Sequence, residues 1–248
     1  TQVRSGQTDV PEGFTHFIMK FDGVSEHNKD KETFGDPMGY GTMEYVYHLM
    51  AKECGIEMMP CRLLDEGNRR HFITQRFDRD GNEKRHVQTL NGLAHVSYKK
   101  AGLYSYAELF TIARELKLSS DDAMQIFKRM VFNIVARNHD DHSKNFGFML
   151  DDQYHWQLAP AYDLVYSYKP KSYWVGSHWM KLNGKRDNFT REDVYSLGKL
   201  SSLFSKHKID QIIDETTEHV SKWNSLAAEN CVPHSLIELI GSNLRLTI

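Results

Sequence analysis

A change of hydrophobic pattern part-way along the chain is the feature that most constrains its fold. Before about residue 100, short alternating runs such as "THFIMKF", "MMPCRLL" and "RHFITQRF" predict strands, and "TMEYVYHLMAKECG" predicts one helix among them. After about residue 100, apolar residues recur at helical spacing. The predicted helices cover "YSYAELFTIARELKL", "DDAMQIFKRMVFNIVARN", "REDVYSLGKL", "IDQIIDETTEHVSKWNSLAAEN" and "HSLIELIGSNLRL". We therefore expect a smaller mixed α/β part followed by a larger helical part.

The junction between the two parts lies near "QRFDRDGNEK", a stretch with a turn signal. We assign residues 1–78 to the first part and residues 79–248 to the second. A chain of 248 residues with 40% hydrophobic content can bury one sizeable core or two lobes that share a cleft. Clefts between unequal parts are where small-molecule sites commonly lie.

Composition excludes several classes of protein. The 31 basic and 33 acidic side chains give a net charge of −2, so the chain has no general attraction to nucleic acid or to anionic membranes. The three cysteines lack zinc-type spacing and indicate a reducing compartment. No apolar run reaches membrane-spanning length, and "TQVRSGQTDV" lacks the apolar core of a signal peptide. We expect a cytoplasmic protein, whose sequence here starts without Met, as if an upstream part were missing.

A polar run, "NHDDHSKN", follows the most strongly patterned helix. The apolar residues of that helix share one face and should anchor it in the core: Phe127, Met130, Val131, Ile134 and Val135. The polar run is then expected to form a short loop held by a rigid element, and "FGFML" after it returns to a strand pattern.

The spacing within this run matches the needs of phosphoryl transfer. That reaction requires an acceptor for the hydroxyl proton, oxygen ligands for Mg²⁺ and a lysine on the phosphates. Asp140 and Asn145 have the Asp-x-x-x-x-Asn spacing of the protein-kinase catalytic loop, and Asp163 in "APAYDL" follows as a second metal ligand. Lys20 on its apolar strand and Glu44, expected in the first turn of the next helix, would fix the phosphates.

Each of these features also has a plain structural interpretation. Asp140 and Asp141 could be an acidic helix exit, although the dipole at a helix C-terminus disfavours anions unless a cation offsets them. Lys20 could extend its ammonium group from a strand edge into water. Glu44 could favour an early helical turn, and a single histidine such as His142 is more often a hydrogen-bonded polar residue than a ligand.

Four stretches together resemble the HipA family of bacterial serine/threonine kinases, the toxins of HipA/HipB-type toxin–antitoxin modules. They are "NHDDHSKNFGFML…LAPAYDL", "FIMKF", "MEYVYHLMAKECGIEMMPCRLL" and "QRFDR", and the similarity spans nearly the whole chain. The resemblance implies a bilobal, protein-kinase-like α+β fold that uses ATP and Mg²⁺. It also implies a HipB-like antitoxin as partner, contact with DNA only through that antitoxin, and an aminoacyl-tRNA synthetase as the substrate.

The resemblance assigns a role to each site residue. Asp140 would be the catalytic aspartate, Asn145 and Asp163 the Mg²⁺ ligands, and Lys20 the lysine on the ATP phosphates. The other implied nucleotide contacts are His142 and Lys144 on the D-x-H-x-K-N loop, Gln75, Arg76 and Phe77 in a hinge whose backbone receives adenine, and Tyr162 beside the nucleotide. The family's Gly-rich loop, with its autophosphorylated serine, would precede Thr1.

Two other functions remain open from the sequence. The dipeptide beginning at His139 could belong to a metal-dependent phosphohydrolase, which predicts that histidines such as His86 and His95 converge on one ion. The kinase hypothesis instead places Asn145 and Asp163 there, because Mg²⁺ prefers oxygen ligands. The third hypothesis is a non-catalytic, pseudokinase-like module that binds a partner.

Overall fold

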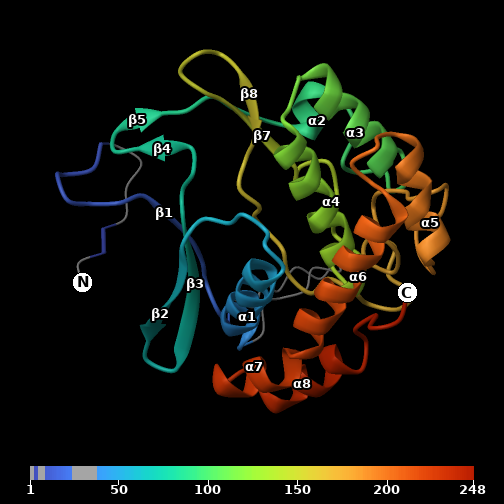
Figure 1. Cartoon of the computed structure of the whole chain (residues 1–248). Coiled ribbons are helices and arrows are strands. Elements are labelled where there is room, and N and C mark those ends of the chain that lie inside the picture. Colours follow the sequence, from blue (N-terminus) through green and yellow to red (C-terminus); the bar gives the residue numbers. More distant parts are fainter. Residues whose placement is uncertain (1–2, 5–8, 24–37) are drawn as a thin grey trace.

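The computed structural model describes residues 3–4, 9–23 and 38–248, and shows a mixed α/β protein (Figure 1). Its N-terminal sheet has the antiparallel order β1-β3-β2, formed by β1 (Phe17–Lys20), β2 (Cys61–Glu66) and β3 (Arg69–Gln75). All three strands were predicted from alternation, but β1 is shorter than the patterned stretch. In the register, Lys20 pairs with Phe72 of β3 at the end of β1.

Helix α1 (Tyr40–Glu53) packs against β2 and β3. The buried Asp22 carboxylate accepts hydrogen bonds from the amides of Gly39 and Gly41, which the first turn of the helix leaves unpaired. Because the helix begins at Tyr40, Glu44 lies in its second turn, and the prediction that it lies in the first turn was wrong. Gly41 permits close packing on the sheet, since a Cβ atom there would lie 2.1 Å from the Arg70 carbonyl oxygen.

Two further antiparallel sheets follow in the described residues. β4 (Arg79–Asp80) and β5 (Glu83–Lys84) form a hairpin at the turn signal near the predicted junction. β6 (Val87–Thr89), β7 (Gly147–Leu150) and β8 (Trp156–Leu158) form a three-stranded sheet. Only β7 was predicted, because strands of three residues are too short to show alternation.

The remaining described elements are mainly helices. They are α2 (Leu90–Leu93), α3 (Tyr106–Glu115), α4 (Ser120–Val135), α5 (Arg191–Tyr195), the 3-10 helix Ser196–Lys199, α6 (Lys206–Ser221), α7 (Trp223–Glu229) and α8 (His234–Gly241). Capping boxes start α3 and α4. The long helix predicted over 209–230 is two helices, because the chain breaks at Lys222. None of the described helices is both long and apolar enough to cross a membrane.

The core runs without interruption from α1 into the helical part. The five residues predicted to anchor α4 are all buried. Tyr47 of α1 donates a hydrogen bond to the Ala136 carbonyl just after α4, at 2.8 Å, and its ring meets the edge of Trp223 in α7. These contacts fix the end of α4, from which the polar run emerges, relative to α1 and the N-terminal sheet (Figure 1).

Candidate functional site

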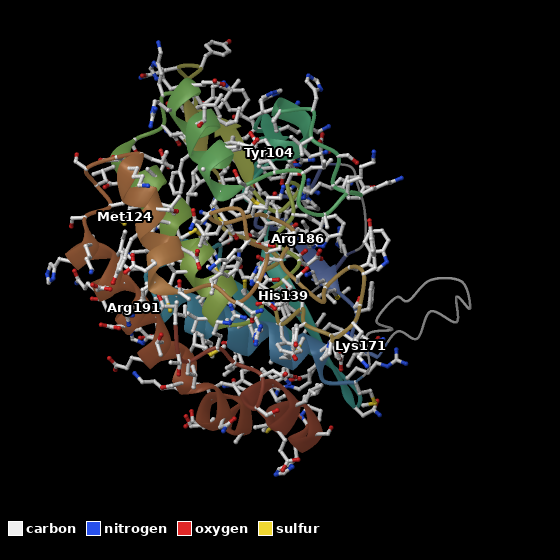
Figure 2. The ribbon with its side chains drawn as sticks, turned by 90° about the vertical axis from the view of Figure 1, so that its right-hand side faces the viewer. Tyr104, Met124, His139, Lys171, Arg186 and Arg191 are labelled. Atoms are coloured by element: carbon white, nitrogen blue, oxygen red, sulfur yellow. The ribbon has the colours of Figure 1, made fainter. Side chains whose placement is uncertain are left out.

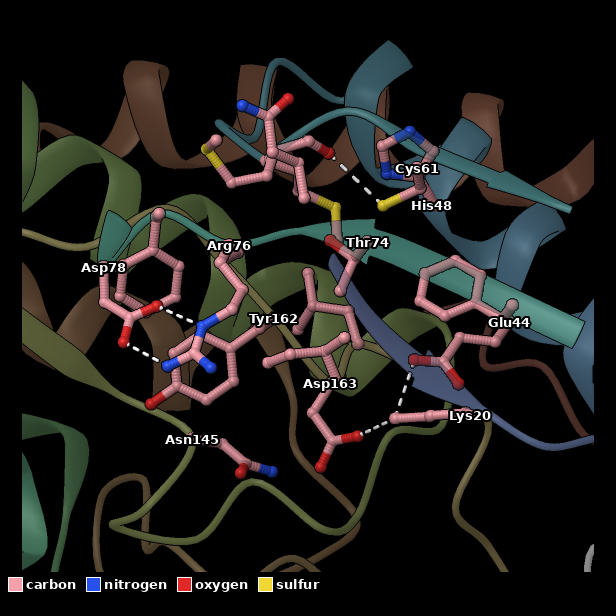
Figure 3. A pocket seen from close by; sticks show the side chains of 18 of the residues that line it. Lys20, Glu44, His48, Cys61, Thr74, Arg76, Asp78, Asn145, Tyr162 and Asp163 are labelled. Carbon is pink, nitrogen blue, oxygen red and sulfur yellow. Dashed lines mark hydrogen bonds and ion pairs between the residues drawn. The ribbon is translucent and has the colours of Figure 1, made fainter. Parts of the chain in front are cut away.

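A cavity of about 460 Å³ lies between the N-terminal sheet, α1 and the segments that follow α4 and β8 (Figure 3). This volume falls in the range of small-molecule sites. Its walls carry Lys20 from β1, Glu44 from α1, Asn145 from the loop after α4 and Asp163 from the segment after β8. The fold therefore brings together four of the predicted residues from four distant parts of the sequence.

An ion cluster spans one end of this cavity. The Lys20 ammonium group lies 2.7 Å from a Glu44 carboxylate oxygen and also hydrogen-bonds the Asp163 carboxylate (Figure 3). The Glu44 side chain is only 9% exposed, whereas those of Lys20 and Asp163 are 42% and 36% exposed. Glu44 is thus fixed in the wall, while the other two groups remain accessible to a ligand.

The cluster keeps both accessible groups ionised. Burial alone would lower the pKa of Lys20, but the charges of Glu44 and Asp163 outweigh it and raise that pKa above its ordinary value. Burial alone would raise the pKa of Asp163, yet Lys20 and a hydrogen bond from Asn145 lower it. An ammonium group and a carboxylate therefore stand side by side at neutral pH.

The Asp163 backbone adopts a left-handed conformation, with φ of 57°. Side chains other than glycine rarely adopt this conformation, although aspartate tolerates it better than most. Strain of this kind costs on the order of 1–3 kcal/mol and concentrates at functional sites. In this conformation the Asp163 carboxylate accepts a hydrogen bond from Lys20.

Asp140 stands beside this cluster, in the loop after α4. Its side chain is 38% exposed, and the ring nitrogen Nε2 of His142 lies 3.7 Å from its carboxylate. Burial, followed by the negative charges of Asp163 and Asp141, raises the pKa of Asp140, and His142 offsets part of that rise. Asn145 closes the loop by donating from its amide to the Asp140 carbonyl at 2.8 Å.

Asp141, the next residue, is fully buried and has a different environment. It accepts hydrogen bonds from the Tyr106 hydroxyl at 2.6 Å, from Nδ1 of His178 at 3.0 Å and from the Trp179 amide at 2.7 Å. These three partners come from other segments, and no pattern in the sequence pointed to them. Asp141 therefore secures the loop, while Asp140 faces a cleft.

Two of the predicted loop residues lie outside the cavity. The Lys144 ammonium group lies 3.4 Å from the centre of the Tyr98 ring and does not line this cavity, so its role in holding the nucleotide stays a prediction. A lysine over an aromatic ring is stabilised by the quadrupole of that ring. Lys144 reaches the cavity only through its carbonyl, which accepts from the Tyr162 hydroxyl at 2.6 Å. His142 lies beside Asp140 instead of in this cavity.

The predicted hinge residues all line the opposite end of the cavity. The amides of Gln75 and Arg76 are already used, since they donate to the carbonyls of Pro60 and His16. In the part of the chain that the structure describes, the Phe77 amide donates to no acceptor. Of the three hinge amides, only that of Phe77 is therefore available to a ligand.

Aromatic and apolar groups complete this end of the cavity. The rings of Phe77 and Tyr162 stack at 5.7 Å between centres. His48, Cys61 and Thr74 also line the cavity, and the sequence did not identify them (Figure 3). Burial lowers the pKa of His48 to about 4, so its ring is neutral near pH 7. The apolar end suits a flat, uncharged ring system, whereas the other end suits charged groups.

The histidines needed for a transition-metal site do not converge. His139, which is labelled in Figure 2, is fully buried. Its ring packs against that of His178, with 4.1 Å between ring centres. His86 packs against Trp156, and His95 is exposed. Over residues 3–4, 9–23 and 38–248, no three His, Cys, Asp or Glu side chains form a group that could hold a metal ion. The convergence predicted by the phosphohydrolase hypothesis is thus not found among these residues.

Comparison with known families gives one match over most of the chain. Residues 2–223 match the model of the HipA-like C-terminal domain family. A candidate kinase of Haemophilus influenzae is 23% identical over 227 residues, which cover 79% of this chain and 66% of that protein. The candidate kinase Y4mE of Sinorhizobium fredii is 26% identical over 126 residues, which cover 47% of this chain and 30% of that protein. The chain spans less than two thirds of the length of either relative.

Many solved structures share the fold, among them the following two. One is a chain in the complex of the toxin–antitoxin proteins HipA and HipB with operator DNA from Shewanella oneidensis MR-1. It has a TM-score of 0.68 and 15% identity, and the match covers 96% of this chain and 64% of that chain. The other is the proinflammatory kinase CtkA of Helicobacter pylori, with a TM-score of 0.54, 12% identity, and coverage of 92% and 87%. At these identities the likeness shows the fold alone.

Proposed function

Because the chain belongs to the HipA-like C-terminal domain family, we propose that it is the catalytic part of a serine/threonine protein kinase. The enzyme would transfer the γ-phosphate of ATP to a protein hydroxyl. The observation that carries this proposal is the ion cluster of Lys20, Glu44 and Asp163 at one end of a cavity, with Asp140 and Asn145 beside it. Since the chain spans only part of its relatives, the activity, substrate and partners of the whole protein are all proposed.

In this proposal the molecule has the bilobal layout of a protein kinase. Residues 1–78 form the smaller lobe, and residues 79–248 form the larger lobe with the catalytic loop. The cavity supports this division, because its walls combine the N-terminal sheet and α1 with the segments after α4 and β8. ATP would bind at this junction.

The charged end of the cavity would hold the phosphates. Lys20 would contact the phosphate oxygens, and Glu44 would hold the ammonium group in place. Asp140 would accept the proton of the attacking hydroxyl as the acceptor oxygen reaches the γ-phosphorus. Its raised pKa makes it a stronger base than an ordinary aspartate.

Asn145 and Asp163 fit a magnesium ion. Both offer oxygen donors, Asp163 is ionised, and both line the cavity next to Lys20. Magnesium usually takes one or two carboxylates and completes its shell with substrate phosphates and water, so a larger protein cage is not required. When bound, the ion would neutralise charge on the phosphates.

The apolar end would receive adenine. The Phe77 amide is the hinge amide without an acceptor among the described residues, and the Tyr162 ring stacks on the Phe77 ring. Gln75 and Arg76 would shape this end through their side chains, since their amides are engaged. Substitution of Tyr162 by leucine should therefore weaken ATP binding more than substitution by phenylalanine.

The cellular role proposed is that of a toxin in a toxin–antitoxin module. Support comes from the family and from the fold shared with a chain of the HipA–HipB–operator DNA complex of Shewanella oneidensis. A HipB-like antitoxin would be the partner, with DNA reached only through it. By the family resemblance, the substrate would be an aminoacyl-tRNA synthetase in the cytoplasm. Expression of the full-length protein alone should arrest growth, and the Asp140→Ala variant should not.

The direct test is transfer of labelled γ-phosphate from ATP to protein by the full-length protein. Asp140→Ala and Asp163→Ala should abolish transfer, while Tyr154→Ala, at an exposed position on the β7–β8 connection, should not change it. Transfer at the wild-type rate by the Asp140→Ala variant would contradict the proposal. Nucleotide binding without transfer by the wild-type protein would instead favour a pseudokinase-like module.

A further inference from the structure

A second cavity, of about 320 Å³, adjoins the first. The two share Lys20, Glu44 and Asp163, but Asp140 lines only the second cavity. The hinge residues, in turn, line only the first. The two cavities therefore meet at the ion cluster, where the γ-phosphate would lie in the proposed kinase.

We propose that the second cavity receives the phosphate acceptor, a protein segment whose serine or threonine is flanked by an apolar or aromatic side chain. This inference rests on the proposed function and names the substrate class for the same site. Asp140 lines this cavity, and a general base must lie within hydrogen-bond reach of the hydroxyl whose proton it accepts. A hydroxyl that meets Asp140 must therefore enter through the second cavity.

The transfer step then balances across the two cavities. A bond forms between the acceptor oxygen and the γ-phosphorus, and the bond from that phosphorus to the β–γ bridging oxygen breaks. The hydroxyl proton passes to Asp140, and ADP leaves through the first cavity. In-line transfer needs the attacking and leaving oxygens on opposite sides of the phosphorus, which two cavities meeting at the phosphate can provide.

The walls of the second cavity favour an apolar residue beside the serine or threonine that accepts the phosphate. Phe21, Val165, Tyr166 and Val175 give it a mainly apolar surface. Phe21 is 53% exposed, and its exposed apolar surface would be covered when an apolar side chain enters.

Charge in the second cavity acts against acidic segments. Among the residues that the structure describes, its walls hold the carboxylates of Glu44, Asp140 and Asp163 and one ammonium group, that of Lys20. An acidic residue beside the acceptor hydroxyl would be repelled by this excess of negative charge. The preferred acceptor is therefore apolar rather than acidic next to its hydroxyl.

The experiment uses the full-length protein, labelled ATP and synthetic peptides that differ only in the residue beside one serine, which is Leu, Ala or Asp. We expect kcat/KM for the Leu peptide to exceed that for the Asp peptide by about tenfold or more. In Phe21→Ala, KM for the Leu peptide should rise about tenfold. The dissociation constant of ADP for this variant should stay within about twofold of wild type.

Ile18→Ala is the matched control. Ile18 is also half exposed and also lies in the N-terminal strand region, but it lines only the first cavity. Its substitution should weaken ADP binding and leave KM for the peptide unchanged. If Phe21→Ala changes only the peptide KM and Ile18→Ala changes only ADP binding, the second cavity binds the peptide and the first cavity binds the nucleotide.

Three outcomes would overturn the inference. They are equal use of the Leu and Asp peptides, no use of any peptide by a protein that phosphorylates other proteins, and weaker ADP binding in Phe21→Ala without a change in peptide KM. In each of these cases the proposed kinase activity stands. Absence of both ATP binding and phosphate transfer in the wild-type protein would instead remove the proposed function and, with it, this inference.

Discussion

The neighbouring aspartates Asp140 and Asp141 lie in two different kinds of polar region. Asp140 belongs to a cleft cluster, which also contains Lys20, Glu44 and Asp163. Asp141 belongs to a buried network with Tyr106, His178 and Trp179. The cleft cluster keeps three of its four side chains more than a third exposed, whereas the Asp141 and His178 side chains are 0% exposed.

The contrast indicates that Asp141 fixes the loop, whereas Asp140 is available for chemistry. A buried carboxylate with several donors is held in one orientation, and a fully hydrogen-bonded buried network makes its surroundings rigid. A carboxylate at the edge of a cleft, with a raised pKa, remains free to accept a proton. The loop after α4 thus uses one aspartate to fix its shape and presents the other to the cleft.

Asp140→Ala should have the largest effect, and it should fall on activity. Loss of the proton acceptor is expected to lower kcat by about 10²- to 10⁴-fold, a typical contribution of a general base. The melting temperature should hardly change, because the side chain is partly exposed. Steady-state kinetics and thermal unfolding of the same sample measure both. An active variant with a lowered melting temperature would reverse the assignment of the two aspartates.

Asp141→Ala should show the opposite response. Removing it leaves the Tyr106 hydroxyl and Nδ1 of His178 buried without the acceptor that Asp141 supplies, and such losses cost on the order of 3–5 kcal/mol of unfolding free energy. This corresponds to a melting temperature lower by roughly 10 °C for a chain of this size. Asp152→Ala, at an exposed position, is the control. Unchanged stability in Asp141→Ala would remove the buried network from the account.

His48 should make stability depend on pH. In the folded protein burial lowers its pKa to about 4, while the unfolded chain binds a proton near the ordinary value of 6.5. The neutral form therefore stabilises the fold fully above pH 6.5, and this contribution is lost as the pH falls toward 4. The loss approaches about 3 kcal/mol at its limit. His48→Phe should flatten the dependence in urea unfolding between pH 4 and 7, and an identical slope in this variant would assign the effect to other groups.

Lys20→Met should have only a small effect on stability. Because Lys20 is 42% exposed, its ion pairs should contribute only about 0.2–1 kcal/mol to folding. Its loss should nevertheless weaken ATP binding about tenfold, since a phosphate contact disappears. Calorimetric titration with ATP measures this. Wild-type affinity in the variant would mean that the Lys20 ammonium group does not reach the phosphates.

Much of the fold was predictable because its signals are local. Alternation predicted β1, β2 and β3, and helical spacing predicted α1, α3 and α4. The pattern was insufficient where elements are short, as in β6 and β8, or where a helix breaks without proline or glycine, as at Lys222. Hydrophobic periodicity needs several repeats before it can be distinguished from chance.

The candidate site divides in the same way. Fixed spacing in the sequence predicted Asp140 and Asn145, and the stretch "APAYDL" predicted Asp163; the fold brings Asn145 and Asp163 into one cavity with Lys20. The partners of Asp141 come from segments 35 and 37 residues away, so no local pattern could show that this aspartate is buried. The position of Lys144 over Tyr98 is also a long-range contact, which no local pattern in the sequence could show.

The central claim is that Asn145, Asp163, Lys20 and Asp140 form one phosphoryl-transfer centre. The most direct measurement is a crystal structure of the full-length protein with a non-hydrolysable ATP analogue and Mn²⁺, located by its anomalous signal. We expect the metal between Asn145 and Asp163, with the terminal phosphate facing Lys20 and Asp140. A metal beside His139 and His178, or a nucleotide outside the cavity that Lys20 lines, would contradict the account.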